Sequence, residues 1–355
     1  MEQTERTELV DASRMHEVIA QVLMALGVGD VDADVVAEVL VEADLTGVDS
    51  HGIHLLFMYV NRLESGQIRV DSEIQVLDDS GSTVWLDAGL GIGQVVGIKA
   101  VDLAVERARE FGVSAVSVRE ATHLGALGIY TRRAAQAGMI CLCVQNGPTV
   151  VPPFGGTTSM FSTNPISYAI PTRTHPTIVY DIATTAVAGN RLLLAKRRGD
   201  ESIPEGWASD DHGRPTTDTE AASVWNLQWF GGHKGYGLGF LVEVLAGVLA
   251  GSSYGRTEHT SSETQGRERV AKGFTFIAID PDRFIGSEEF ARRTDELIDD
   301  VHRSETAEGV DRIAVPGEFE AERRAQRLRD GVPMSTTVID EIDEIARGFG
   351  TQTLR

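Results

Sequence analysis

The chain has 355 residues, of which 42% are hydrophobic, and a formal net charge of −21 at pH 7. Its length and apolar content predict a globular enzyme with two or three domains or one elaborate α/β body. Because nucleic acid and anionic membranes attract basic surfaces, this charge argues against both as partners. The sequence has no run of about 18 uncharged apolar residues, and its first residues are charged, which predicts a cytoplasmic protein without a membrane span.

The acidic residues are spread along the whole chain, whereas lysine occurs only at positions 99, 196, 234 and 272. Self-repulsion among so many like charges is screened in concentrated salt. An acidic proteome, as in a halophilic source, is therefore a hypothesis that the salt dependence of folding or activity can test.

The chain is expected to begin with a pair of helices, because residues 8–46 carry apolar positions at helical spacing with a break at 27–30. The motif Asp49-Ser50-His51-Gly52 follows, and helical spacing then resumes. Asp49 or Ser50 can cap this next helix, which would place His51 in its first turn, where the helix dipole lowers the pKa of an imidazole. His51 is thus a candidate for chemistry. The alternative is a histidine of the capping region without a catalytic role.

Residues 83–120 imitate a dinucleotide-binding unit. A predicted strand at 83–87, a glycine-rich turn from Gly89 to Gly93, a helix to residue 111 and a second strand ending at Glu120 form a β-turn-α-β pattern. The order of the glycines matches the fingerprint only in part. No further run of alternating strands and helices builds a doubly wound sheet, so the turn is weak evidence for a Rossmann fold.

His123 lies in a predicted loop between that second strand and a helix over 129–137. Catalytic residues are frequent in such loops, and the neighbouring Gly125 and Gly128 leave room for a ligand. The alternative is a loop histidine that caps the next helix.

Three more strands are predicted, at 139–144, within 162–169 and at 177–182. Asn164 precedes a proline and can be a turn residue only. Asp181 ends its strand and is followed by small hydroxyl residues, which suits hydrogen bonding to a carboxamide or ribose and suits a helix N-cap equally well. Cys141 and Cys143 are interpreted as small buried hydrophobes that form no disulfide.

The glycine-rich motif from Gly231 to Gly237 is the most suggestive stretch of the second half. Glycines on both sides of His233 and Lys234 let backbone amides approach a ligand, and the lysine can offer a charge to a phosphate or carboxylate. The alternative is a glycine-rich helix start with a solvated Lys234.

The rest of the second half has a simpler pattern. A long polar excursion over 196–220 precedes the glycine motif, and an apolar helix to residue 251 follows it. We then expect a mobile surface loop at 255–271, a strand at 274–279 and helices at 287–302, 318–331 and 335–349.

Eight short motifs carry a resemblance to a known family. They are Asp49-Ser50-His51-Gly52, Thr122-His123-Leu124-Gly125-Ala126, Thr163-Asn164-Pro165, Asp181-Ile182-Ala183-Thr184-Thr185, Ile203-Pro204-Glu205-Gly206-Trp207, Pro215-Thr216-Thr217-Asp218, Gly231 to Gly237, and Val315-Pro316-Gly317-Glu318. In this order they resemble the malate/L-lactate dehydrogenase family, which also contains ureidoglycolate, sulfolactate and cyclic-imine-carboxylate oxidoreductases. The resemblance covers about residues 8–335.

The resemblance implies an α/β fold that is not Rossmann: a three-layer mixed β-sheet flanked by helices, like that of sulfolactate dehydrogenase. A helical, dimerising portion would come from residues 1–75 and 281–355, and a cofactor-binding and catalytic portion from 76–280. It also implies a homodimer that transfers a hydride between NAD or NADP and a small 2-hydroxy or 2-oxo acid. The turn at Gly89 to Gly93 then becomes structural.

Site residues follow from the same motifs. His123 takes the position of the proton donor and acceptor, with His51 as a second catalytic candidate. Ser50, Tyr59 and Asn164 are expected on the substrate side. The expected cofactor-binding residues are Gly147, Asp181, Ile182, Ala183, His233, Lys234 and Gly235. No metal site is predicted.

Leu55 departs from the family pattern, because members usually carry an arginine three residues after the Ser-His-Gly motif. An arginine fork there would bind the substrate carboxylate. Three explanations are open. Another cation, Arg132, Arg133 or Arg191, replaces it; the substrate lacks that carboxylate; or this chain is a paralogue with altered or lost activity that still binds the cofactor.

A metal-dependent hydrolase is the remaining rival. His51 and His54 lie one helical turn apart, and His123 and His233 could join them. No His-Glu-x-x-His or comparable set accompanies these histidines, which argues against this reading.

Overall fold

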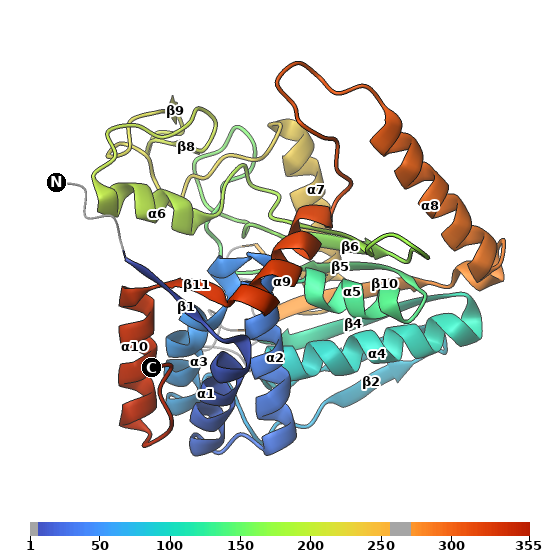
Figure 1. Ribbon diagram of the computed structural model, residues 1–355, viewed down its shortest axis with the longest axis horizontal. Helices are drawn as coiled ribbons and strands as arrows, with labels where there is room; N and C mark the ends of the chain where they lie inside the picture. The colour runs from blue at the N-terminus through green and yellow to red at the C-terminus, as the bar shows by residue number, and fades with distance from the viewer. Residues whose placement is uncertain (1–5, 256–270) are drawn as a thin grey trace.

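The computed structural model describes residues 6–255 and 271–355, and it is built on one seven-stranded sheet (Figure 1). Across this sheet the strands are β2 (Gln75–Asp79), β3 (Thr83–Asp87), β4 (Val113–Ala121), β10 (Lys272–Ile279), β5 (Ile140–Gln145), β6 (Ile166–Ile170) and β7 (Ile178–Ile182). β3 and β4 are parallel, and every other neighbouring pair is antiparallel. The sheet is therefore mixed, as expected.

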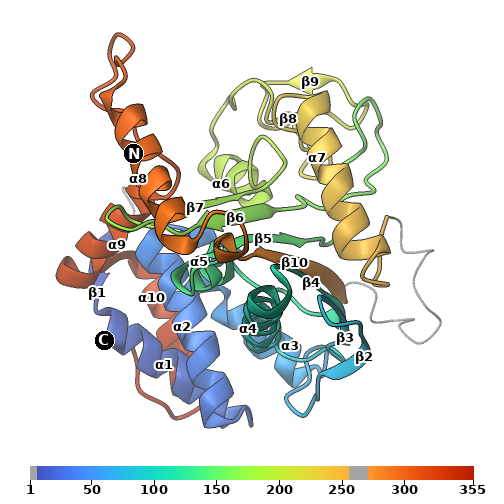
Figure 2. The ribbon, with the colours of Figure 1, turned by 90° about the vertical axis from the view of Figure 1, so that its right-hand side faces the viewer.

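Helices cover both faces of this sheet, which gives three layers (Figure 2). On one face lie α4 (Gly93–Phe111), which makes the parallel crossover from β3 to β4, and α5 (Gly128–Gln136). On the other lies α7 (His233–Glu243), which continues as a π-helical turn at Val244–Val248. The main sheet core packs between the strands and α4 and α5. The predicted mixed sheet flanked by helices is confirmed, and the β-turn-α-β unit belongs to it without a doubly wound sheet.

A second core joins the two ends of the chain. It combines side chains of α1 (Ala12–Ala25), α2 (Asp30–Thr46), α3 (Leu56–Glu64) and α10 (Thr336–Gly348). A two-stranded antiparallel sheet of β1 (Thr7–Val10) and β11 (Val332–Ser335) connects these ends. The helical portion is thus built from both termini, while the division at residues 75 and 280 stays a prediction.

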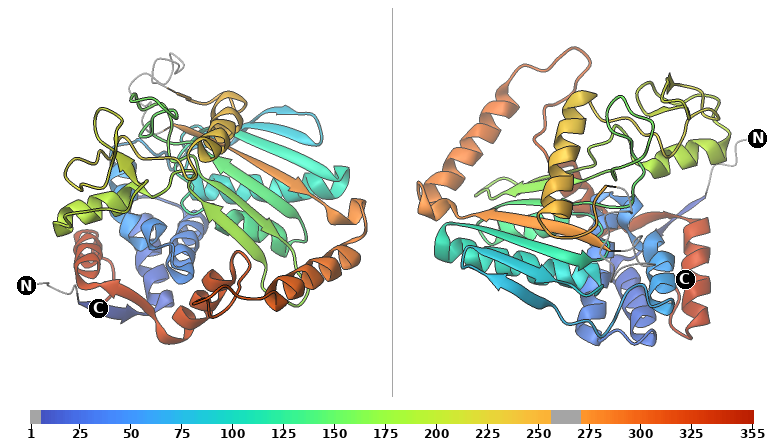
Figure 3. Two further views of the ribbon diagram at one scale, coloured as in Figure 1. Left: turned by 90° about the horizontal axis from the view of Figure 1, so that it is seen from above. Right: turned by 180° about the vertical axis from the view of Figure 1, so that it is seen from behind.

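Two C-terminal helices lie outside this second core. α8 (Ser287–Arg303) lies beside the sheet and away from α1 and α10 (Figure 3), and its Asp295 accepts hydrogen bonds from the backbone N–H groups of Arg173 and Thr174 at 3.1 and 2.9 Å. α9 (Glu318–Asp330) packs against α2, where Arg324 pairs with Glu42 at 2.7 Å.

Several details differ from the sequence expectations. A helix that the sequence did not predict, α6 (Gly189–Arg198), ends at the start of the polar excursion, and the excursion itself contains a short hairpin of β8 (Ala208–Ser209) and β9 (Pro215–Thr216). Side chains of this region form an apolar cluster of their own. The segment predicted as a mobile loop, 255–271, lies outside the described residues except for its two ends. Cys141 and Cys143 are free and buried in β5. Within residues 6–255 and 271–355, no helix is long and apolar enough to cross a membrane.

Candidate active site

His123 is held in the loop between β4 and α5 by contacts on both sides. Gln145 accepts the backbone N–H of Leu124 at 3.3 Å and donates to the carbonyl of Thr122 at 3.1 Å, so one buried amide pins the backbone before and after the histidine. The hydroxyl of Thr122 donates to the Gly91 carbonyl at 2.9 Å. The glycine-rich turn therefore supports the loop that carries His123.

The ring of His123 is oriented by a buried phenol. Tyr59 Oη lies 2.9 Å from His123 Nδ1, and Gln94 Nε2 donates to the same Oη at 2.5 Å. Tyr59 is 1% exposed, and this burial raises the pKa of its phenol. Gln94 is buried, and its other amide atom, Oε1, has no hydrogen-bond partner among the described residues. The phenol stays protonated and can serve Nδ1 as donor or acceptor.

His51 stacks on His123, with ring centroids 5.6 Å apart and an interplanar angle of 22°. Its Nδ1 lies 2.9 Å from Ser50 Oγ. Desolvation, then the neighbouring His54, lowers the pKa of His51 to about 4. The expected direction is right but the expected cause is wrong: His51 lies in the 3-10 turn Asp49–His51, and burial rather than an α-helix dipole shifts it.

The pKa of His123 is lowered further, to about 3, first by burial and then by the charges of His51, Arg62 and Lys272. Both histidine residues keep part of their surface exposed. Both rings are neutral at pH 7. A neutral imidazole held by a fixed partner is suited to accept a proton from a hydroxyl group.

Two cations near His123 were not among the predicted site residues. Arg62 lies on α3, one turn beyond Tyr59, and is half-buried. Lys272 opens β10 opposite Ala121 of β4 and is 8% exposed. Burial and the charge of Arg62 lower the pKa of Lys272 to about 8, against the opposing effect of Glu243. Spacing from Tyr59 was the one sequence signal for Arg62. Lys272 becomes a neighbour only through strand pairing.

Asn164, expected on the substrate side, joins β6 to α7. Its backbone has φ 38°, and its Nδ2 donates to the Gly239 carbonyl and to Glu243 Oε2, each at 2.8 Å. Glu243 is also the carboxylate that acts on Lys272. Asn164 is therefore linked to the cation cluster through Glu243, while its Oδ1 has no hydrogen-bond partner within the described residues.

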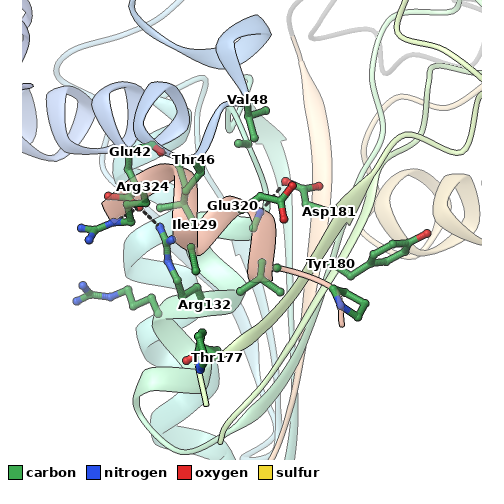
Figure 4. A pocket seen from close by; sticks show the side chains of 18 of the residues that line it. Glu42, Thr46, Val48, Ile129, Arg132, Thr177, Tyr180, Asp181, Glu320 and Arg324 are labelled. Atoms are coloured by element: carbon green, nitrogen blue, oxygen red, sulfur yellow. Dashed lines mark hydrogen bonds and ion pairs between the residues drawn. The ribbon is translucent and has the colours of Figure 1, made fainter. Parts of the chain in front are cut away.

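A cleft of about 740 Å³ opens between α2, α5, β7 and residues 314–325 (Figure 4), and His51, Tyr59, His123 and the two cations are not among the residues that line it. Asp181 and Ile182 line it, as does Arg132, which pairs with Glu42 at 2.5 Å. Asp181 Oδ2 accepts the Gly128 N–H at 2.7 Å. Burial raises the pKa of Asp181 to about 6, although hydrogen bonds from backbone N–H groups oppose the rise.

The other predicted cofactor residues follow strand ends or open α7: Gly147 comes after β5, Ala183 comes after β7, and His233, Lys234 and Gly235 form the first turn of α7. A Cβ on Gly235 would lie 2.3 Å from the Phe230 carbonyl oxygen and 3.0 Å from that of Thr184, so this glycine lets α7 approach the segment after Asp181. His233 meets the ring of Phe154, and Lys234 is exposed. A Cβ on Gly147 would lie 2.4 Å from Ser162 Oγ. Gly235 therefore lies close to Thr184, three residues after Asp181, and Asp181 accepts a hydrogen bond from Gly128 at the end of the His123 loop.

The cations named from the sequence as substitutes for the missing arginine are engaged elsewhere. Arg132 is paired with Glu42, and Arg133 forms two hydrogen bonds to Asp102, at 2.6 and 2.8 Å. Arg191 lies on α6 and is exposed. For the hydrolase reading, residues 6–255 and 271–355 contain no group of three or more His, Cys, Asp or Glu side chains that could hold a metal ion.

The chain is similar to known dehydrogenases over nearly its whole length. A family model described as malate/L-lactate dehydrogenase matches residues 10–343. The L-sulfolactate dehydrogenase of Methanocaldococcus jannaschii is 38% identical, with 94% of this chain and 95% of that protein covered. The malate dehydrogenase of Pyrococcus abyssi is 36% identical, with 97% and 96% covered.

A solved structure supports the same family assignment. The sulfolactate dehydrogenase structure from Methanocaldococcus jannaschii superposes with a TM-score of 0.89 at 36% identity, with 97% of this chain and 98% of that chain covered. The match extends over the sheet and over the helical portion from both termini. The chain therefore belongs to the malate/L-lactate dehydrogenase family of oxidoreductases.

Proposed function

We propose that this protein is an NAD- or NADP-dependent dehydrogenase that interconverts a small 2-hydroxy acid and its 2-oxo acid. The observation that carries the proposal is His123: its Nδ1 is fixed by Tyr59 at 2.9 Å, its ring is stacked on His51, and two cations lie close to it. This arrangement supplies a proton-transfer group and positive charge for an anionic substrate at one place.

The predicted cofactor residues offer groups that suit a nicotinamide dinucleotide. Asp181, half protonated near pH 6, can donate or accept a hydrogen bond with a carboxamide, and the exposed Lys234 can offer its charge to a phosphate. Ile182 and Ala183 would pack on the nicotinamide. Gly147, His233, Lys234 and Gly235 would contact the rest of the cofactor. When bound, the nicotinamide accepts the hydride in oxidation and supplies it in reduction.

His123 moves the proton. In oxidation its neutral Nε2 takes the proton of the substrate hydroxyl, and in reduction the imidazolium returns it to the developing alkoxide. The free protein holds the ring neutral because burial and nearby cations oppose its charge. A bound substrate carboxylate would counter these cations and raise the pKa of His123 toward neutrality.

Tyr59 and Gln94 accommodate both states of the ring. The neutral ring that can take a proton at Nε2 carries its hydrogen on Nδ1, and this N–H donates to Tyr59 Oη before and after Nε2 is protonated. Because Nδ1 donates to Tyr59, the phenol needs an acceptor for its own proton. The unpartnered Oε1 of Gln94 provides one after rotation of the amide. Gln94 is thus a positioning residue.

Binding and turnover distinguish this proposal from its rivals. Fluorescence titration with NADH and NADPH should show binding of at least one, and a screen of 2-oxo acids should show its oxidation. Binding without turnover would favour the paralogue with lost activity. Absence of binding, or loss of activity to a chelator, would refute the proposal. A homodimer and a cytoplasmic location stay predictions that light scattering and fractionation can check.

A further inference from the structure

Leu55 occupies the position where the family resemblance places an arginine, and in the structure this side chain belongs to apolar packing. It packs against the apolar core formed by both chain termini. An apolar side chain in that contact offers no hydrogen bond to a substrate. The active site therefore needs another source of positive charge if it is to bind a 2-oxo acid.

Helix α3 carries such a charge on the face that meets the active site. Tyr59 defines this face, because its Oη lies 2.9 Å from His123 Nδ1. Arg62 follows Tyr59 by three residues and Leu55 by seven. Leu55 ends the 3-10 turn Ile53–Leu55 directly before α3, and Arg62 lies one turn of α3 beyond Tyr59, so both belong to the segment that carries Tyr59 to the active site.

The guanidinium of Arg62 has no carboxylate partner within residues 6–255 and 271–355, whereas Arg132 and Arg133 are paired with Glu42 and Asp102. It is half-buried, and desolvation lowers its pKa. Its charge also lowers the pKa of both His123 and Lys272. Partial burial of an unpaired cation costs free energy, which a bound anion next to it would offset. The described residues provide no such anion beside the proton-transfer group.

We propose that Arg62 binds the carboxylate of the 2-hydroxy or 2-oxo acid, so that the substrate-binding cation stands seven residues further along the chain, at position 62 and not at position 55. This inference rests on the proposed function and names the residue that determines its substrate class. It selects the first of the three explanations for Leu55, with a cation that none of them named. Substrates without a carboxylate next to the reacting carbon should be poor ones.

Oxamate, a 2-oxo acid analogue that is not reduced, serves as the probe. Its affinity for the full-length protein is measured by calorimetry, alone and with saturating NADH or NADPH. A hydrogen bond to a charged group is worth about 1.5–3 kcal/mol, so Arg62→Gln should weaken oxamate binding about 10- to 100-fold. Arg62→Lys should lie between the two, because it keeps the charge but loses the fork. Wild-type affinity in Arg62→Gln would overturn the inference.

Arg69→Gln is the matched control, because Arg69 is an exposed arginine that pairs with Asp71 at 3.4 Å and lies outside the site. It should bind oxamate like the wild type. Melting temperatures of all variants identify any that unfold. NADH or NADPH binding by Arg62→Gln should equal that of the wild type, which separates a lost carboxylate site from a damaged cofactor site.

A double variant tests the relocation itself. Leu55→Arg with Arg62→Leu returns the arginine to the family position and should bind oxamate at least tenfold more tightly than Arg62→Leu alone. No gain would show that positions 55 and 62 do not serve one anion site and would overturn the relocation. Turnover is measured separately: a wild-type protein that binds oxamate through Arg62 but reduces no 2-oxo acid would refute the proposed function and leave the Arg62 assignment intact.

Discussion

The proton-transfer role rests on one imidazole, and removing it should separate chemistry from binding. His123→Gln should lower kcat about 10²- to 10⁴-fold, the usual contribution of a positioned general acid or base, with little change in the dissociation constant of NADH or NADPH. His212→Gln, at an exposed histidine outside the site, is the control. Steady-state kinetics and fluorescence titration measure both. Retention of more than a tenth of wild-type kcat would contradict the assignment.

Tyr59 acts through His123, so its loss should change a pH profile as well as a rate. Tyr59→Phe removes the 2.9 Å contact with Nδ1 and leaves the ring free to turn. We expect kcat to fall roughly tenfold, an amount that matches the loss of one hydrogen bond of about 1 kcal/mol or slightly more, and the acidic limb of the kcat profile to shift. An unchanged profile with a reduced rate would mean that the phenol only fills space.

The pH dependence of substrate binding should follow Lys272, whose pKa is lowered to about 8. Below that pH the side chain is a cation and attracts an anionic substrate; above it the charge is lost, while the substrate carboxylate and Arg62 do not change. KM for a 2-oxo acid should therefore rise as the pH increases through about 8. Lys272→Arg keeps its charge and should move the rise above pH 9. If its profile matches that of the wild type, another group is responsible.

The site residues that could be predicted from the sequence are those whose residue type and local motif indicate a function. His123, His51, Ser50 and Tyr59 meet in the structure. The first three stand in motifs that carry the family resemblance, and Tyr59 lies on the helix that follows one of these motifs. Arg62 has no motif, and its position follows from the face that α3 turns inward. The cause of the low pKa of His51 could not be predicted either, since desolvation depends on packing across the whole site.

At the scale of elements, the glycine motif that opens α7 can be tested with two neighbouring glycines. In Gly235→Ala the new Cβ would meet backbone oxygens of Phe230 and Thr184, and shifting α7 from the segment after Asp181 should cost about 1–3 kcal/mol and weaken cofactor binding. Gly237→Ala meets no atom within 4 Å and should be neutral or stabilising by up to about 1 kcal/mol. Equal cofactor affinity in both variants would limit the motif to helix packing.

Elements with strong periodicity were predictable, and short or polar ones were not. The helices α1, α2, α4 and α5 and the strands β3 to β7 fall within a few residues of their expected bounds. β1 and β11 have four residues each, and they are strands only because they pair with each other across the chain. α6 was not predicted, because it is short and polar on average, and its apolar side is recognised only from its packing in the cluster that contains Leu192 and Trp229.

At the scale of the molecule, sheet order decides which residues meet. β10 lies between β4 and β5, although about 150 residues separate it from β4 in the chain. This insertion places Lys272 opposite Ala121 and so beside the His123 loop. A pattern of apolar residues predicts that a segment is a strand but contains no information about its partner. The mixed sheet was predicted from the family resemblance, because hydrophobic periodicity alone does not predict how strands pair.

The net charge of −21 makes a prediction for the whole molecule, because like charges repel more strongly in the compact state than in the expanded chain. The screening length falls from about 10 Å at 0.1 M salt to about 3 Å at 1 M. Melting temperature and activity should therefore rise with NaCl over this range. Betaine at equal osmolality does not screen charge and should reproduce little of the rise. A melting temperature that is indifferent to NaCl, or that responds equally to betaine, would show that acidic self-repulsion does not limit stability and would remove the support for a halophilic source.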